Sequence, residues 1–135
     1  MPADQPQPAP HHRAARLASA ATLSVLAWAG WLGWDTEYDL DPVTNTTSGP
    51  YQAWQVIGCV LTLLAAAVVA GPAARPTVAA VVVTVPFTGA WAVSAALTDD
   101  SGLFLVGAVL VAAALYVGAW GVALLTSAVL RRRAR

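Results

Sequence analysis

The stretch YQAWQVIGCVLTLLAAAVVAGPAA, residues 51–74, decides the fold, because it contains no Asp, Glu, Lys, Arg or His. A helix of about 20 apolar residues crosses the hydrocarbon core of a bilayer, which is about 30 Å thick. The stretch lacks the alternation of polar and apolar residues that a strand of a membrane barrel needs. An α-helix is the structure that satisfies its own backbone in lipid, so the stretch predicts a transmembrane helix.

Three further stretches have the same character: residues 14–34, interrupted only by Arg16, residues 76–98 and residues 101–130. The expected fold is an all-α membrane protein, an up-down bundle of four transmembrane helices with spans at about 14–34, 51–71, 76–98 and 103–130. Residues 1–13 are expected to form a disordered tail and residues 131–135 a basic tail, on either side of a transmembrane domain at 14–130. Only 10% of the residues are charged, against about 25% in soluble proteins.

The arginines orient these spans. All seven basic residues are Arg. They precede the first span, occupy the second connection and follow the last span: Arg13, Arg16, Arg75, Arg131, Arg132, Arg133 and Arg135. The connections at 35–50 and 99–101 contain no basic residue. Cytoplasmic connections are rich in Lys and Arg, so both termini are expected in the cytoplasm of a multi-pass cell-membrane protein. A cleaved signal peptide ending at Ala27-Trp28-Ala29 is the alternative for the first span.

Ionisable side chains are missing from the spans beyond their ends. Such groups inside a membrane usually mark proton relays, ion paths or substrate sites. Proton-coupled transport and intramembrane metalloprotease or serine protease chemistry are therefore not expected. We predict no catalytic residue, no cofactor and no nucleic-acid partner, because the arginines lie where topology explains them.

Neutral polar residues remain within the spans. They share one helical face in 51–71 and one in 76–98, and they are Gln52, Gln55, Cys59, Thr62, Thr84 and Thr88. One interpretation is interhelical hydrogen bonding, worth about 1 kcal/mol or less per bond. The other is a polar crevice that opens to the outside. Pro86 predicts a kink in the third span, with Thr84 and Thr88 near enough to satisfy the backbone groups that it frees.

Aromatic and small residues follow two further patterns. Aromatic residues gather at the outer ends of the first two spans, where an interfacial belt is expected and a ligand-stacking cluster is the alternative: Trp28, Trp31, Trp34, Tyr51 and Trp54. Small residues four apart favour close helix packing, as in Ala66 and Ala70 or Ala114 and Gly118. The same small residues would serve a homo-oligomer equally well.

The first outer connection, Asp35 to Pro50, has sixteen residues, whereas about 2–8 suffice between antiparallel helices. Four acidic residues alternate with Thr36, Tyr38, Leu40 and Pro42, so an extended backbone would turn Tyr38 and Leu40 toward the bundle or the headgroups. The turn-forming run from Thr44 to Pro50 predicts a short hairpin or a lid over the outer helix ends.

Carboxylates of this loop are weak candidates for a cation site together with those of the third connection. The residues concerned are Asp35, Glu37, Asp39, Asp41, Asp99 and Asp100. Carboxylate oxygens suit Ca²⁺, but the EF-hand pattern fails, since Leu40 replaces the sixth-position Gly and Thr46 the twelfth-position Glu. We therefore predict no metal site, and a solvated acidic loop is the main interpretation.

The chain resembles the uncharacterised small four-helix membrane proteins of high-GC actinobacteria. The resemblance rests on Ala- and Val-rich spans with Arg as the only basic residue, and on the block SGPYQAWQVIGC at 48–59. It is a resemblance of type across the whole chain. It implies no activity, and it carries over no functional residue.

Three functions from different classes fit this sequence. The favoured one is a non-enzymatic accessory or assembly protein, whose acidic outer loop docks a membrane-protein partner. The first alternative is a passive or facilitated pathway for a small neutral solute along the Gln55 and Thr84 faces. The second alternative is an outer-surface membrane enzyme that uses loop carboxylates as acid and base.

Overall fold

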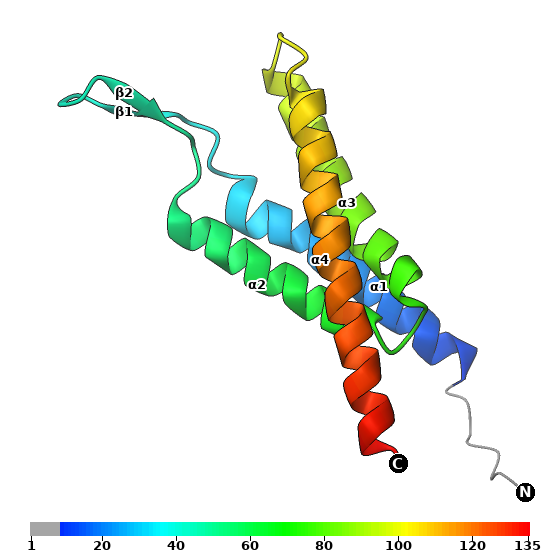
Figure 1. Cartoon of the computed structure of the whole chain (residues 1–135). Helices are drawn as coiled ribbons and strands as arrows, with labels where there is room; N and C mark the ends of the chain where they lie inside the picture. Colours follow the sequence, from blue (N-terminus) through cyan, green and yellow to red (C-terminus); the bar gives the residue numbers. More distant parts are fainter. Residues whose placement is uncertain (1–8) are drawn as a thin grey trace, which may run out of the picture.

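The computed structural model describes residues 9–135, which are mainly α-helical (Figure 1). Three helices are long and apolar enough to cross a membrane: α2 (Ala53–Ala70), α3 (Pro76–Thr98) and α4 (Phe104–Arg133). The first helical segment consists of α1 (Pro10–Ala27) and a π-helical turn, η1 (Trp28–Leu32). This segment differs from the other three helices in two ways. It begins with charged residues, Arg13 and Arg16, and it is divided into two elements.

The helix bounds follow the expected spans, with corrections at the chain ends. Helix α3 occupies residues 76–98, as the sequence predicts. Helix α4 continues through Arg131, Arg132 and Arg133, so most of the predicted basic tail is helical. The disordered tail predicted for residues 1–13 lies largely outside the described residues, and its part from Pro10 to Arg13 is the first turn of α1. Proline at a first helical position is favourable, because the missing N–H has no partner there in any case.

The π-turn changes the phase of the first helical segment. The Gly33 amide donates to the carbonyl of Trp28, five residues back, at 2.8 Å. Buried positions before it follow the α-helical repeat at Ala20, Ser24 and Ala27, and the next is Leu32, five residues on. The extra residue of a π-turn explains the longer step.

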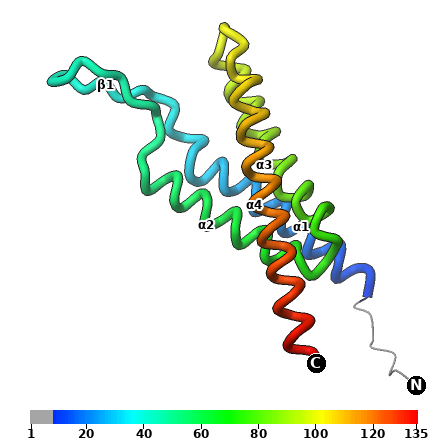
Figure 2. Tube along the Cα trace, viewed as in Figure 1, coloured from blue at the N-terminus to red at the C-terminus, as the bar shows by residue number. Residues whose placement is uncertain are grey.

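The helices form two arms. The first arm contains α1, η1 and α2, and the second contains α3 and α4. The arms are joined by contacts of α1 with α3 and of α2 with α4. Figures 1 and 2 show that α2 and α4 lie close near the Arg-rich end and diverge toward the opposite end, so the arms form a V. We call the closed end of the V the inner end and the open end the outer end.

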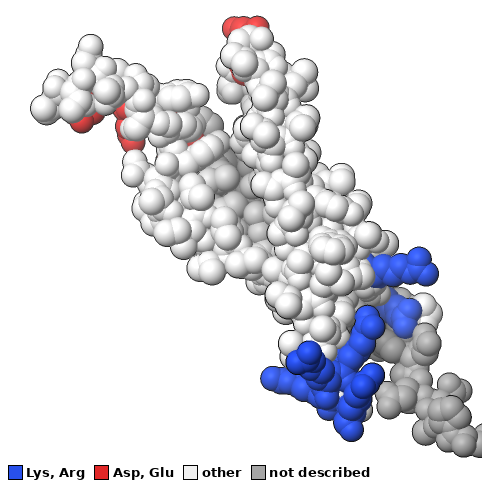
Figure 3. Space-filling model, in the orientation of Figure 1, with Lys and Arg blue, Asp and Glu red and all other residues white. Residues whose placement is uncertain are grey.

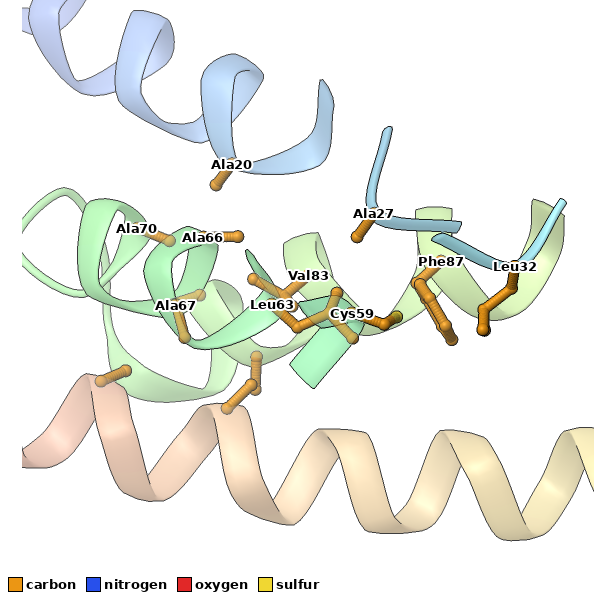
Figure 4. Packing of buried hydrophobic residues seen from close by; sticks show 14 residues of the cluster. Ala20, Ala27, Leu32, Cys59, Leu63, Ala66, Ala67, Ala70, Val83 and Phe87 are labelled. Carbon is orange, nitrogen blue, oxygen red and sulfur yellow. The ribbon is translucent and has the colours of Figure 1, made fainter. Parts of the chain in front are cut away.

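Alanine supplies most of the core. Small side chains let helix backbones approach closely in a protein that gains little from burying apolar surface against lipid. Figure 4 shows Ala20, Ala66, Ala67 and Ala70 gathered between the helices, Leu63 and Val83 near the centre, and Phe87 farther along toward Leu32. The predicted packing pair Ala66 and Ala70 is therefore buried, whereas Ala114 and Gly118 are exposed and line an open groove.

Helix α3 is continuous through Pro86. The expectation that neighbouring threonines compensate for this proline is wrong. The hydroxyl oxygens of Thr84 and Thr88 are buried and have no hydrogen-bond partner among the described residues.

Candidate functional site

The outer loop is a hairpin that projects away from the helices (Figure 1). Strands β1 (Asp39–Asp41) and β2 (Thr46–Ser48) pair antiparallel, with Asp39 opposite Ser48 and Asp41 opposite Thr46. Every residue of both strands is exposed. Of the two predicted arrangements the structure has the hairpin, and it extends outward instead of covering the helix ends.

The hairpin turn is stabilised by its own side chains. The Asp41 carboxylate accepts the amide of Val43 at 2.8 Å, which with the Thr44 contacts lowers the pKa of this carboxyl below its usual value. The Asn45 amide donates to the Asp41 carbonyl at 2.9 Å. Asn45 has a φ of 53°, in the left-handed region that Asn tolerates better than most residues. Asp41 is therefore occupied within the turn.

Two glutamines of α2 hold the base of the hairpin. The side-chain amide of Gln55 donates to Asp35 Oδ2 at 3.0 Å, and that of Gln52 donates to Asp39 Oδ2 at 2.9 Å. Gln55 Oε1 also accepts the backbone amide of Gln52 at 2.5 Å. Gln55 is fully buried, so both ends of its amide are used inside the protein. These bonds fix the direction in which the hairpin leaves the first arm.

Apolar side chains of the loop point to solvent. Tyr38 is 70% exposed, Leu40 63% and Val43 89%. The expectation that Leu40 turns toward the bundle is wrong, because the hairpin extends beyond the helices. Tyr38 is mostly exposed, but it lines a hollow together with Trp91 and Thr98 of α3 and so partly faces the bundle. An exposed apolar group beside carboxylates is a feature of interaction surfaces.

The acidic residues of the two outer connections lie apart. Figure 3 shows one acidic group along the hairpin side and another at the tip of the second arm. Asp99 belongs to the second group. Its carboxylate accepts hydrogen bonds from the Ser101 side chain and from the amides of Ser101 and Phe104, the last at 2.9 Å, and these lower the pKa of Asp99. Glu37 and Asp100 are exposed.

The six weak metal candidates are thus divided between three situations. Asp35 and Asp39 bind glutamines, Asp41 and Asp99 order their own turns, and the other two face solvent. Within residues 9–135 no group of three or more His, Cys, Asp or Glu residues is placed to hold a metal ion.

The six polar residues of the predicted crevice lie in different surroundings. Gln52 and Gln55 bind the loop, and the Thr62 hydroxyl accepts the indole N–H of Trp31 at 3.0 Å. Thr84 and Thr88 lie in α3 without partners in the described part of the chain. Of the six, Cys59 alone lines an open groove of about 540 Å³, whose other lining residues are almost all apolar. Thr62 fits the first interpretation of these residues, interhelical hydrogen bonding, because its partner Trp31 lies in η1.

Two tryptophan–glycine contacts were not foreseen from the sequence. A Cβ atom at Gly58 would lie 2.6 Å from the Trp31 ring, and one at Gly107 would lie 2.9 Å from the Trp91 ring. Glycine therefore leaves room for one large ring within each arm. Trp54 adds an edge-on contact to Trp31, with 6.2 Å between ring centroids. Trp31 and Trp54, which were expected in an interfacial belt, therefore also pack within the first arm. Their spacing in the sequence does not show these contacts.

Charge is separated along the molecule. The Arg side chains gather at the inner end and the Asp and Glu side chains of the described residues at the outer end (Figure 3). The predicted topology anchors Arg75, Arg131, Arg132 and Arg133 belong to the inner group, together with Arg13 and Arg16 near the start of α1. Comparison of the chain with protein families, with curated proteins and with solved structures finds no match.

Proposed function

We propose that this protein is a non-enzymatic accessory or assembly protein of the cell membrane that docks a membrane-protein partner through its outer hairpin. The hairpin carries the proposal, because it projects beyond the helices with Tyr38, Leu40 and Val43 exposed beside carboxylates. A matching partner surface would combine an apolar patch with basic residues. Buried aromatic and aliphatic anchors, ringed by charges, supply most of the binding energy in protein interfaces.

The hairpin base supports this role. Binding costs less when the recognition element is ordered in advance. The Asp35–Gln55 and Asp39–Gln52 bonds tie the hairpin to α2 before any partner arrives. Asp41 and Asn45 order its turn. A merely solvated loop would need neither the buried amide of Gln55 nor the paired strands.

The proposed topology has four membrane crossings in an up-down order, with both termini in the cytoplasm. Three helices have the required length and composition, and the helical segment from Pro10 to Leu32 supplies the fourth crossing. The Arg-rich inner end agrees with a cytoplasmic location and the acidic hairpin with an outer one.

Labelling of single cysteines tests the topology. In a Cys59→Ser background, Val43→Cys should react with a membrane-impermeant maleimide in intact cells. Ala134→Cys should react only after permeabilisation. Labelling of Ala134→Cys in intact cells would contradict the orientation.

Site-specific photocrosslinking tests the docking role. A photoreactive amino acid at Val43 should give a discrete adduct with one larger protein in cell membranes. The matched control is Leu125, which is 68% exposed but lies on α4. Substituting Tyr38→Ser and Leu40→Ser should abolish the Val43 adduct while the protein remains in the membrane. Adducts with lipid alone, or the same adduct from both positions, would refute the docking function.

A further inference from the structure

The space between the two arms has a closed inner end. A Cβ at Gly71 would lie 3.3 Å from Cα of Ala123, and the Ser127 hydroxyl donates to the Gly71 carbonyl at 3.2 Å. Helices α2 and α4 therefore touch here through small residues. Farther out they diverge and leave an open groove of about 540 Å³. Ligand pockets typically have volumes of about 300–1,000 Å³.

This groove is apolar and lies along the middle of the helices. Its walls come from α2, α3 and α4 and include Leu63, Leu64, Phe87, Val111, Leu115 and Gly118. A second hollow of about 350 Å³ lies at the outer ends of the helices. Its lining is mixed: polar side chains, among them Thr36, Tyr38, Ser94, Thr98 and Asp99, alternate with apolar ones such as Pro50, Ala95 and Phe104. Tyr51 and Trp91 line both spaces, which makes the two hollows neighbours with a shared aromatic wall.

The two hollows adjoin at Tyr51 and Trp91, and the outer one has the more polar lining. On α3, Phe87 lies in the apolar groove and Thr98 in the outer hollow, about 16 Å apart along a helix that rises 1.5 Å per residue. The gradient of polarity therefore runs from headgroup level into the hydrocarbon core. A water-soluble ligand matches only its outer part, whereas a lipid has the same gradient. Figure 3 shows the hollow between the arms.

We propose that these adjoining hollows bind one lipid molecule with an uncharged, hydroxyl-rich headgroup, one of its acyl chains along the α2–α4 groove and its head between Tyr38, Thr98 and Asp99. Charge complementarity selects the headgroup. The outer hollow contains Asp99 and, among its described lining residues, no Arg, and the chain has no Lys. A phosphate would face a carboxylate without a cation, whereas sugar hydroxyls can donate to carboxylate and hydroxyl oxygens. The proposal rests on the membrane embedding proposed above and not on the docking role of the hairpin.

Native mass spectrometry of the full-length protein in detergent tests the proposal. The probes are dipalmitoyl monoglucosyldiacylglycerol and dipalmitoyl phosphatidylglycerol, which have the same chains and different heads. The expected result is one tightly retained glycolipid per chain and weaker binding of the anionic lipid.

A matched pair of glycine variants locates the binding site. A Cβ at Gly118 or at Gly121 would meet no atom within 4 Å, so both positions accept a side chain without strain inside the protein. Gly118 lines the groove and Gly121 does not. Gly118→Leu should lower glycolipid affinity about tenfold, the scale of an overpacked site, and Gly121→Leu should leave it unchanged.

A second variant tests the headgroup. The Thr98 hydroxyl bonds only to carbonyls of its own helix among the described residues, so Thr98→Arg adds a cation at an exposed position with little loss. It should shift the preference toward phosphatidylglycerol. Equal binding of both lipids in every variant would overturn the proposal. A protein dimer that Gly118→Leu dissociates, with no lipid retained, would assign the groove to a second copy and overturn it also.

Discussion

Each arm places a tryptophan ring over a glycine of the neighbouring helix, yet the two arms are held together differently. In the first arm, Trp31 lies over Gly58 and its indole donates to Thr62, while Gln55 reaches the loop. In the second arm, Trp91 lies over Gly107, and the connection is ordered by Asp99 at the start of α4. The long outer loop is thus held by side-chain hydrogen bonds from α2. The short connection between α3 and α4 is ordered by hydrogen bonds within its own turn.

The largest expected effect compares the two glycines. Gly58→Ala should lower the free energy of unfolding by about 2 kcal/mol, within the ~1–3 kcal/mol typical of overpacking, because three ring atoms of Trp31 would lie within 2.7 Å of the new methyl group. Gly107→Ala should cost less, since one ring atom lies at 2.9 Å and the next two at 3.8 Å. Unfolding in mixed micelles measures both, with Gly121→Ala as the control. The reverse order would show that the Trp91 contact is the tighter one.

The next effect compares the two glutamines at the hairpin base. Gln55→Leu should cost about 2 kcal/mol, because it leaves the half-buried Asp35 carboxylate and the Gln52 backbone amide without their partner. Gln52→Leu breaks a bond to Asp39 at the surface, where a lost hydrogen bond costs about 1 kcal/mol or less. Denaturation of the two variants side by side gives the difference. Equal losses of stability in the two variants would mean that the burial of Gln55 does not strengthen its hydrogen bonds.

Replacing a threonine by valine should change the free energy of unfolding in opposite directions in the two arms. Thr62→Val removes the acceptor of the Trp31 indole and should destabilise by about 1 kcal/mol. Thr84→Val replaces a buried hydroxyl that lacks a partner among the described residues, and it should stabilise by about 1 kcal/mol. Thermal unfolding in detergent reads both signs. Loss of stability in both variants would show that the Thr84 hydroxyl has a partner, such as a bound water.

The smallest effect is the pH dependence of the Asp99 turn between α3 and α4. The pKa of Asp99 is lowered below its ordinary value of 3.8. A carboxyl with a lowered folded-state pKa adds stability above its unfolded-state pKa and loses it as the pH falls through the folded-state value. Between pH 7 and pH 3, wild type should therefore lose slightly more thermal stability than Asp99→Asn. Asp100→Asn serves as the control and should behave like wild type.

Helix positions were readable from the sequence because membrane-spanning helices are defined by composition over about 20 residues. The bounds of α3 illustrate this, since Arg75 precedes it, Pro76 begins it and Asp99 follows it. The functional contacts were less readable. Gln55 was recognised as an unusual polar residue in a span, but helical spacing gives only its face and not its partner, which lies twenty residues away in a loop. Gly58 gave no signal, because a glycine in a helix has the same appearance whether or not a ring covers it.

The V shape was not predictable either. Small-residue motifs in α2 and α4 predict close contact in general, and they do not distinguish the inner contact at Gly71 and Ala123 from the open stretch at Ala114 and Gly118. Farther out, the larger side chains of Leu63, Phe87 and Trp91 line the open stretch. Such an arrangement depends on three helices at once, whereas a motif describes one.

The π-turn at Trp28–Leu32 means that the first helical segment is one residue longer than a regular helix with the same ends. Deleting Ala29 or Gly30 would restore an unbroken α-helix and leave the composition of the segment almost the same. Because the π-turn takes up one extra residue within a single turn, every residue beyond the deletion would keep its face of the segment. Trp31 would stay over Gly58, and Asp35 would stay beside Gln55. A deletion in a regular turn, such as that of Ala21, would instead rotate every residue beyond it by about 100°, because an α-helix has 3.6 residues per turn. The π-turn is therefore what lets the segment hold one more residue without changing the direction of the outer hairpin.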